Sequence, residues 1–113
     1  MADLLIVLTT VPVGEPGDLI ARALVDERLA ACVHVLAPAV STYRWQGAVT
    51  REPEQQLVIK TLRARIGPLE KRLRELHPYE VPEFIVLDVA AVSDAYLAWV
   101  RDSVSATRDS EHR

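Results

Sequence analysis

Cysteine, glycine and phenylalanine are scarce in this chain. Its 113 residues include one cysteine, four glycines and one phenylalanine. A single cysteine cannot close an internal disulfide, and it offers no Cys-x-x-Cys pair for structural zinc. Apolar runs such as Leu4–Leu8 are far too short to cross a bilayer. The sequence therefore predicts a protein without an internal disulfide and with no membrane as partner, and we expect it to be cytoplasmic.

Positive charge is also in short supply. Thirteen Lys and Arg stand against sixteen Asp and Glu, which gives a net charge of −3 at pH 7. No basic stripe with interleaved aromatic residues is present, and this argues against nucleic acid as a partner. Phosphate-binding glycine loops and the Gly-x-Ser-x-Gly nucleophile turn are missing as well. Because no nucleophile can be paired with a base, we expect that the protein is not an enzyme.

What the chain does contain is a regular succession of strand and helix patterns. Apolar runs and alternation predict strands at 4–8, 32–36, 41–45, 48–62 and 83–91, and helical spacing predicts helices at about 16–28, at 66–76 and after Ser93. Two interleaved β-α-β units followed by an extra C-terminal helix predict an α+β, ferredoxin-like sandwich. We expect a single domain over residues 1–104 and a polar, frayed tail over 105–113.

A long hairpin is the most unusual of the predicted elements. Gln46–Gly47 predicts a tight turn that joins the two middle strands. Alternation places Tyr43 and Trp45 on one face of the hairpin. Arms of this length would overhang a domain of this size. An overhanging hairpin with exposed aromatic residues is expected to be covered by a partner chain.

The segment His77–Glu83 gathers an imidazole, a phenol and two carboxylates within seven residues. Pro78 and Pro82 stiffen it, because each proline fixes its own φ and restricts the residue before it. Two interpretations stay open. The segment is either a functional loop in which Glu80 and Glu83 anchor cations or backbone amides, or a rigid turn whose polar groups only satisfy backbone ends.

Cys32 and His77 are the candidate metal ligands. A thiolate and an imidazole together favour copper or zinc over magnesium or calcium. Two ligands do not complete a site, so water or a neighbouring subunit would have to supply the rest. His34 is a further candidate ligand. The alternatives are that Cys32 is a small buried hydrophobe and that His34 lies beside solvent or an interface.

Six short motifs in this order resemble the CutA family of divalent-cation tolerance proteins. They are Thr9-Thr10-x-Pro12, Arg28-Leu29-Ala30-Ala31-Cys32-Val33, Ser41-x-Tyr43-x-Trp45-x-Gly47, Glu54-x-Gln56-Leu57 with Lys60-Thr61, His77-Pro78-Tyr79-Glu80-Val81-Pro82-Glu83, and Tyr96-Leu97-x-Trp99. Each motif is weak alone, but together they extend over nearly the whole chain. On these residues the chain is identified as a member of the family.

The resemblance implies a tight homotrimer in which long hairpins reach neighbouring subunits. It also implies tolerance of copper and other divalent cations as the function, with no obligatory cofactor. The metal-linked positions of the family correspond to Cys32 and His77 in this chain. The resemblance further implies a polar cleft between subunits formed by Ser41, Tyr43, Trp45, Lys60, Tyr79, Glu80 and Glu83. The family usually has asparagine where His34 stands, which either strengthens metal binding or changes an interface contact.

Two other functions remain open. Trimeric small-molecule-binding regulators of the PII type share the predicted architecture, and the polar cleft would suit a ligand with a carboxylate or phosphate group. The missing glycine-rich loop counts against a nucleotide as that ligand. The other possibility is a structural scaffold in which Tyr43, Trp45 and Trp99 serve assembly alone.

Overall fold

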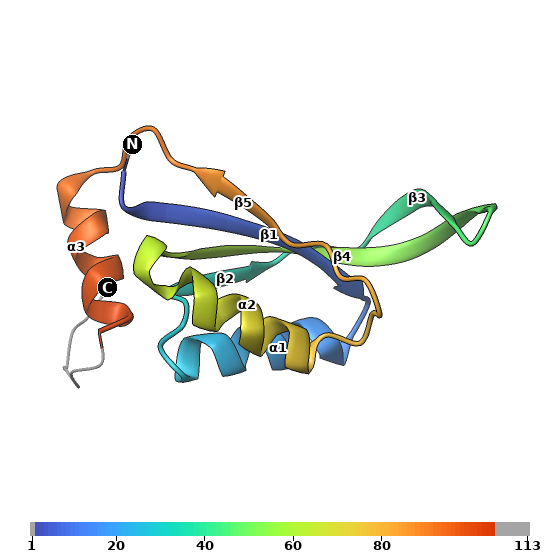
Figure 1. Ribbon diagram of the computed structural model, residues 1–113, viewed down its shortest axis with the longest axis horizontal. Helices are drawn as coiled ribbons and strands as arrows, with labels where there is room; N and C mark the ends of the chain where they lie inside the picture. The colour runs from blue at the N-terminus through green and yellow to red at the C-terminus, as the bar shows by residue number, and fades with distance from the viewer. Residues whose placement is uncertain (1, 106–113) are drawn as a thin grey trace.

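The computed structural model describes residues 2–105. Its elements are β1 (Leu4–Pro12), α1 (Glu15–Asp26), β2 (Cys32–Val35), β3 (Ala39–Trp45), β4 (Ala48–Leu62), the short 3-10 helix η1 (Arg63–Arg65), α2 (Ile66–Leu76), β5 (Ile85–Asp88) and α3 (Asp94–Ser103). α1 and α2 lie against one face of the sheet, and α3 lies at one end of it (Figure 1). The predicted α+β class is confirmed. None of the helices in this part of the chain is long and apolar enough to span a membrane.

The two β-α-β units interleave in one antiparallel sheet. The strand order is β2-β4-β1-β5, and β3 pairs with the outer part of β4. β4 therefore lies between the two strands joined by α1, and β1 lies between the two strands joined by α2. The central pair runs from Leu4 opposite Leu62 to Pro12 opposite Glu54. This register decides which side chains share a face of the sheet.

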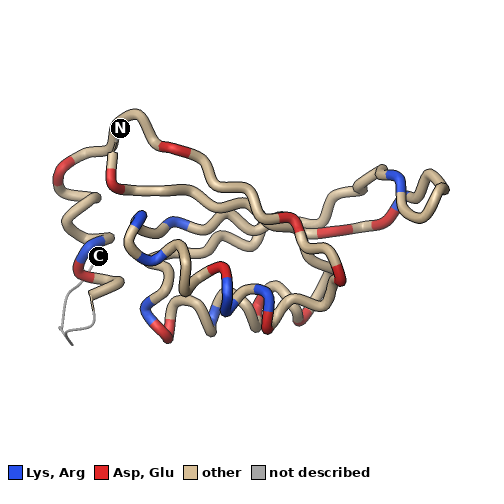
Figure 2. The backbone as a smooth tube through the Cα atoms, viewed as in Figure 1, with Lys and Arg blue, Asp and Glu red and all other residues tan. Residues whose placement is uncertain are grey.

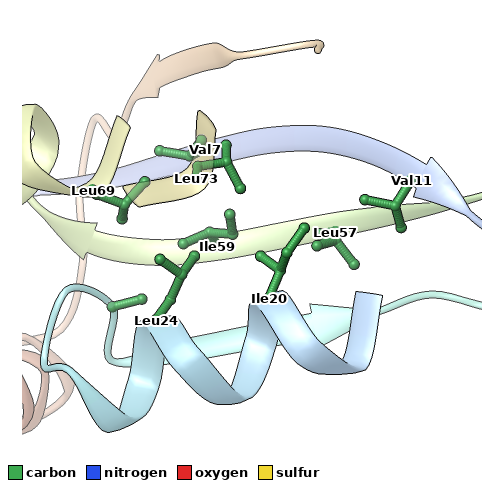
Figure 3. Packing of buried hydrophobic residues seen from close by; sticks show 9 residues of the cluster. Val7, Val11, Ile20, Leu24, Leu57, Ile59, Leu69 and Leu73 are labelled. Atoms are coloured by element: carbon green, nitrogen blue, oxygen red, sulfur yellow. The ribbon is translucent and has the colours of Figure 1, made fainter. Parts of the chain in front are cut away.

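The core fills the space between the sheet and the helices α1 and α2. Val7 and Ile59 lie opposite each other in β1 and β4 and point toward the helices (Figure 3). Leu24 of α1 and Leu69 of α2 meet them, and all four side chains have 0 % of their surface exposed. Full burial of a side chain of this size stabilises the fold by about 1.5–3 kcal/mol.

Among residues 2–105, the opposite face of the sheet is covered at one end only. There, Val100 of α3 and the following Val104 pack with Leu4 and Leu62. Further along β1, Leu8 is half-buried and pairs with Ile85 of β5, which is 45 % exposed. Beyond its start, β1 is therefore buried on one face and only partly covered on the other.

The hairpin formed by β3 and the first half of β4 extends well beyond the body of the molecule (Figure 1). Its turn is the predicted one, with φ of 49° at Gln46 and 83° at Gly47. These positive φ values match a turn that follows the right-handed twist of the strands. Val40 and Val49 of the hairpin are 59 % and 65 % exposed. The predicted long, overhanging hairpin is confirmed.

Two strands end at places other than expected. β1 was predicted to end before Thr9, yet it continues to Pro12 because β4 pairs with it over its whole length. The last strand was predicted at 83–91, yet β5 spans only Ile85–Asp88, which pair with Leu5–Leu8 of β1. The predicted tail at 105–113 lies outside the described residues except for Ser105.

Candidate functional site

A cavity of about 680 Å³ lies where the hairpin leaves the body of the molecule. The hairpin forms one wall, and the segment of residues 78–83 after α2 forms the other. Its lining residues are Thr10, Ser41, Tyr43, Trp45, Thr50, Glu52, Glu54, Pro78, Tyr79, Glu80, Val81, Pro82 and Glu83. We call this cavity the hairpin pocket. Six of the residues predicted for a polar cleft therefore come together here.

Two tyrosines hold two carboxylates of β4 in place in the hairpin pocket. Tyr43 Oη donates a hydrogen bond of 2.5 Å to Glu52, and Tyr79 Oη donates one of 2.5 Å to Glu54. The hydrogen bond to Glu52 raises the pKa of Tyr43 to about 12. Burial, followed by the bond to Glu54, raises the pKa of Tyr79 above its usual value. Both phenols therefore stay protonated and act as donors at neutral pH.

Glu83 lacks such a donor. Its Oε2 atom is buried and has no hydrogen-bond partner among residues 2–105. Burial, and then the negative charge of Glu54, raise the pKa of the Glu83 carboxyl. A carboxylate that has lost water without gaining a donor is destabilised. This buried oxygen is thus left without a donor beside the pocket.

The electrostatic character of the hairpin pocket is negative. Its lining includes the carboxylates of Glu52, Glu54, Glu80 and Glu83 but no lysine, arginine or histidine. Acidic positions gather along β4 at the base of the hairpin and in the segment after α2 (Figure 2). Like charges repel, so the expectation that the cleft suits a carboxylate or phosphate ligand is not supported. The pocket suits a cation.

Cys32 and His34 form a second, separate group on β2, which is one of the two edge strands in the order β2-β4-β1-β5. Alternation along the strand places both side chains on one face. Cys32 Sγ lies 3.7 Å from His34 Nε2. Cys32 is half-buried and His34 is exposed, so an ion from solvent can reach the pair. The two groups are soft and borderline donors of the kind that bind copper or zinc.

His77 uses both of its ring nitrogens inside the chain. Its Nε2–H donates to the carbonyl oxygen of Thr10 at 2.9 Å, and its Nδ1 accepts from the backbone N–H of Tyr79 at 3.1 Å. The residue is 7 % exposed, and burial lowers its pKa. The neutral imidazole closes α2 and positions Tyr79, but it has no lone pair free for a metal in this arrangement.

Within one chain, Cys32 and His77 do not meet. Cys32 lies opposite Lys60, and Lys60 lies opposite Ile6 of β1, whereas His77 bonds to Thr10 on the same strand. Four residues of strand correspond to about 13 Å. Among residues 2–105, no three His, Cys, Asp or Glu side chains come together as a ligand set.

Lys60 also lies outside the hairpin pocket. Its Nζ is instead 5.6 Å from the ring centroid of Tyr96 on α3. In contrast, Glu52 is a pocket residue that the sequence analysis did not single out. The position of Glu52 could have been predicted from the hairpin turn. Once Gln46–Gly47 is taken as the turn, the register places Glu52 opposite Ser41, on the face that carries the aromatic residues.

Comparison with known proteins places the chain among CutA proteins. The family model described as CutA1 divalent ion tolerance protein matches residues 5–103. A divalent-cation tolerance protein CutA from Thermus thermophilus is 45 % identical over 98 residues, covering 87 % of this chain and 95 % of that protein. The chloroplastic protein CutA of Arabidopsis thaliana is 39 % identical over 99 residues, covering 88 % of this chain and 54 % of that protein.

Solved structures agree with the sequence relatives. A crystal structure of CutA from Xylella fastidiosa matches with a TM-score of 0.89 at 41 % identity, covering 92 % of this chain and 100 % of that one. The structure of CutA from Synechococcus elongatus matches with a TM-score of 0.88 at 45 % identity, covering 93 % of each chain. With sequence, fold and motif order in agreement, the chain belongs to the CutA1 family of divalent ion tolerance proteins.

Proposed function

We propose that this protein binds copper, or a similar divalent cation, directly and acts in tolerance of it as a cytoplasmic homotrimer. The observation that carries the proposal is the 3.7 Å contact between Cys32 Sγ and His34 Nε2 on an accessible strand. Two such donors suit copper, and a neighbouring subunit or water would supply the remaining ligands. The Thermus relative is named for divalent-cation tolerance, and direct binding gives that name a physical basis.

His34 takes precedence over His77 in this proposal. For His77 to bind an ion through Nδ1, it would have to release the N–H of Tyr79. That N–H would then be left without its partner in a partly buried loop, which is unfavourable. His34 needs no such rearrangement. The role of His77 as a ligand remains a prediction from the family resemblance.

Exposed apolar surface supports the homotrimer. Val40 and Val49 of the hairpin and Ile85 and Leu87 of β5 are each between 43 % and 65 % exposed. β5 is an outer strand of the sheet, and a two-stranded hairpin is marginally stable alone in water. Contact with further copies of the chain would cover both regions and pair the open strand edge.

A calorimetric titration with copper under anaerobic conditions tests the proposal. The wild-type protein is expected to bind saturably, and Cys32→Ser and His34→Asn are each expected to weaken binding by at least about tenfold. Glu83→Gln, which alters the hairpin pocket, serves as the control and should bind copper as the wild type does. Equal affinity of Cys32→Ser and the wild type would contradict the assignment. Fractionation of cells should recover the protein with cytosolic markers.

The hairpin pocket supports a second candidate function, a small-molecule-binding regulatory trimer of the PII type. Its volume of about 680 Å³ lies within the range of small-molecule sites. A thermal-shift screen distinguishes this function from metal binding, because a ligand that binds only the folded protein raises the melting temperature. Stabilisation by copper alone would favour the first function.

A further inference from the structure

We propose that the pair formed by Cys32 and His34 selects monovalent copper, Cu(I), over divalent ions such as zinc, and that Lys60 sets this preference. The inference rests on the proposed function, because it concerns the same site, and it adds the oxidation state of the bound ion. Three observations support it: the spacing of the pair, the side chains that surround it and the unpaired charge of Lys60.

The spacing of the pair allows both side chains to bind one ion. Cys32 Sγ lies 3.7 Å from His34 Nε2. With metal–sulfur and metal–nitrogen bonds of about 2.3 Å and about 2.0 Å, this separation corresponds to an angle of about 120° at the metal. One ion can therefore bind the thiolate and the imidazole together without a change in the backbone of β2. Its binding releases the thiol proton to water.

The neighbouring strands offer the pair no carboxylate. Residues directly opposite each other in antiparallel strands share a face of the sheet, so the register gives the neighbours of the pair. They are Lys60 and Val58 of β4 and, beyond these, Ile6 and Leu8 of β1. One lysine and three apolar side chains therefore lie where a hard or borderline ion would require oxygen ligands.

The small number of ligands also favours Cu(I). Among residues 2–105, no three His, Cys, Asp or Glu side chains come together around one point. Structural zinc requires a closed tetrahedral set of protein ligands, which one chain does not supply here. Cu(I) is a soft ion that thiolate selects, and it accepts fewer ligands than zinc. The pair alone is therefore a more complete site for Cu(I) than for a divalent ion.

Lys60 adds a positive charge beside the pair. It lies directly opposite Cys32, and its Nζ is 5.6 Å from the ring centroid of Tyr96. Among residues 2–105, no carboxylate forms an ion pair with it. Cu(I) and one thiolate make a neutral complex, whereas a divalent ion and one thiolate keep a positive charge. The ammonium group of Lys60 repels only the second complex, and the apolar neighbours reduce the screening of this repulsion.

Competition titrations of the full chain, reduced and free of oxygen, test the proposal. A chromophoric Cu(I) chelator gives the affinity for Cu(I), and a chromophoric zinc chelator gives the affinity for Zn(II). The wild type is expected to bind Cu(I) more tightly than zinc. In Lys60→Gln the ratio of the Cu(I) affinity to the zinc affinity should fall by about threefold or more, because zinc gains more from the loss of the ammonium charge.

Two further variants separate the position of the charge from other effects. Lys60→Arg keeps the positive charge, so its affinity ratio should stay within about twofold of the wild-type ratio. Lys71→Gln removes the same charge from an exposed position on α2, and solvent and salt screen that charge from the pair. Its ratio should also stay within about twofold of the wild-type ratio.

The outcomes distinguish this inference from the proposed function. If Cu(I) does not bind, or binds equally well in Cys32→Ser, both are wrong. If copper binds through Cys32 but the wild type holds zinc as tightly as Cu(I), only the selectivity is wrong, and this result needs no Lys60 variant to fold. An equal fall in the ratio in Lys60→Gln and Lys71→Gln, or no fall in either, would overturn the role of Lys60.

Discussion

The Nε2–H of His77 donates a hydrogen bond of 2.9 Å to the carbonyl oxygen of Thr10. This contact ties the end of α2 to β1, and it requires a neutral imidazole because Nδ1 accepts from the N–H of Tyr79. Through Tyr79 the same contact reaches Glu54 in the hairpin pocket. His77 thus joins the helix, the central sheet and the pocket.

The first prediction concerns pH. Burial lowers the folded-state pKa of His77, so the unfolded chain takes up this proton first as pH falls. The contribution of His77 to stability is therefore complete above the unfolded pKa of about 6.5 and is lost as pH falls toward the lower folded pKa. Urea unfolding of the metal-free protein across this window should show the loss. In His77→Gln the free energy of unfolding should change less with pH over this window. An equal change in the variant and the wild type would contradict the prediction.

Ser93 is expected to stabilise α3 as its N-cap. Its Oγ accepts a hydrogen bond of 3.2 Å from the backbone N–H of Tyr96. Ser93→Ala should lower the free energy of unfolding by about 1 kcal/mol. Ser93→Asp, which retains a capping oxygen, should unfold at nearly the same urea concentration as the wild type. If alanine and aspartate behave alike, the cap has no role in stability.

Two glycines are expected to respond in opposite directions to substitution. A Cβ at Gly17 would lie 3.3 Å from Val11 Cγ2 and 3.4 Å from Leu57 Cδ2, so Gly17→Val should destabilise the fold by about 1–3 kcal/mol. A Cβ at Gly67 would meet nothing within 4 Å. Gly67→Ala in α2 should therefore raise stability by up to about 1 kcal/mol. Melting curves of both variants test this contrast. An equal fall in melting temperature in both variants would refute it.

Assembly should depend on the hairpin. A carboxylate in place of Val49, which is 65 % exposed, would be unfavourable in an interface but harmless in a monomer. In light scattering, the wild type should have about three times the 12.6 kDa chain mass, and Val49→Asp should be smaller. Val13→Asp, at a position 45 % exposed beyond the end of β1, is the control and should remain trimeric. A wild-type monomer would rule out the trimer.

Local signals predicted much of the fold. Ser93 lies directly before a helical pattern, and Gln46–Gly47 lies between two alternating segments, so the helix cap and the hairpin turn follow from neighbouring residues. The ends of β1 and β5 could not be predicted in this way. They depend on how far β4 and β1 extend as partners, and that pairing joins residues distant in sequence.

In the candidate site, too, features that depend on neighbouring residues could be predicted, and features that depend on distant strand pairing could not. The segment 78–83 and the aromatic residues of the hairpin were identified from their composition, and they line one pocket. The separation of Cys32 from His77 could not be seen in the sequence, because it depends on the register of three strands. The proximity of His34 to Cys32 follows from the spacing of two along one strand, once that strand is known.

The most direct test of copper binding at Cys32 and His34 is X-ray absorption at the copper edge of the loaded protein, prepared anaerobically. The account predicts a sulfur neighbour together with imidazole nitrogen in the wild type. It also predicts loss of the sulfur neighbour in Cys32→Ser and a reduced imidazole signal in His34→Asn. A wild-type spectrum with oxygen and nitrogen neighbours only, unchanged in Cys32→Ser, would contradict direct copper binding at this site.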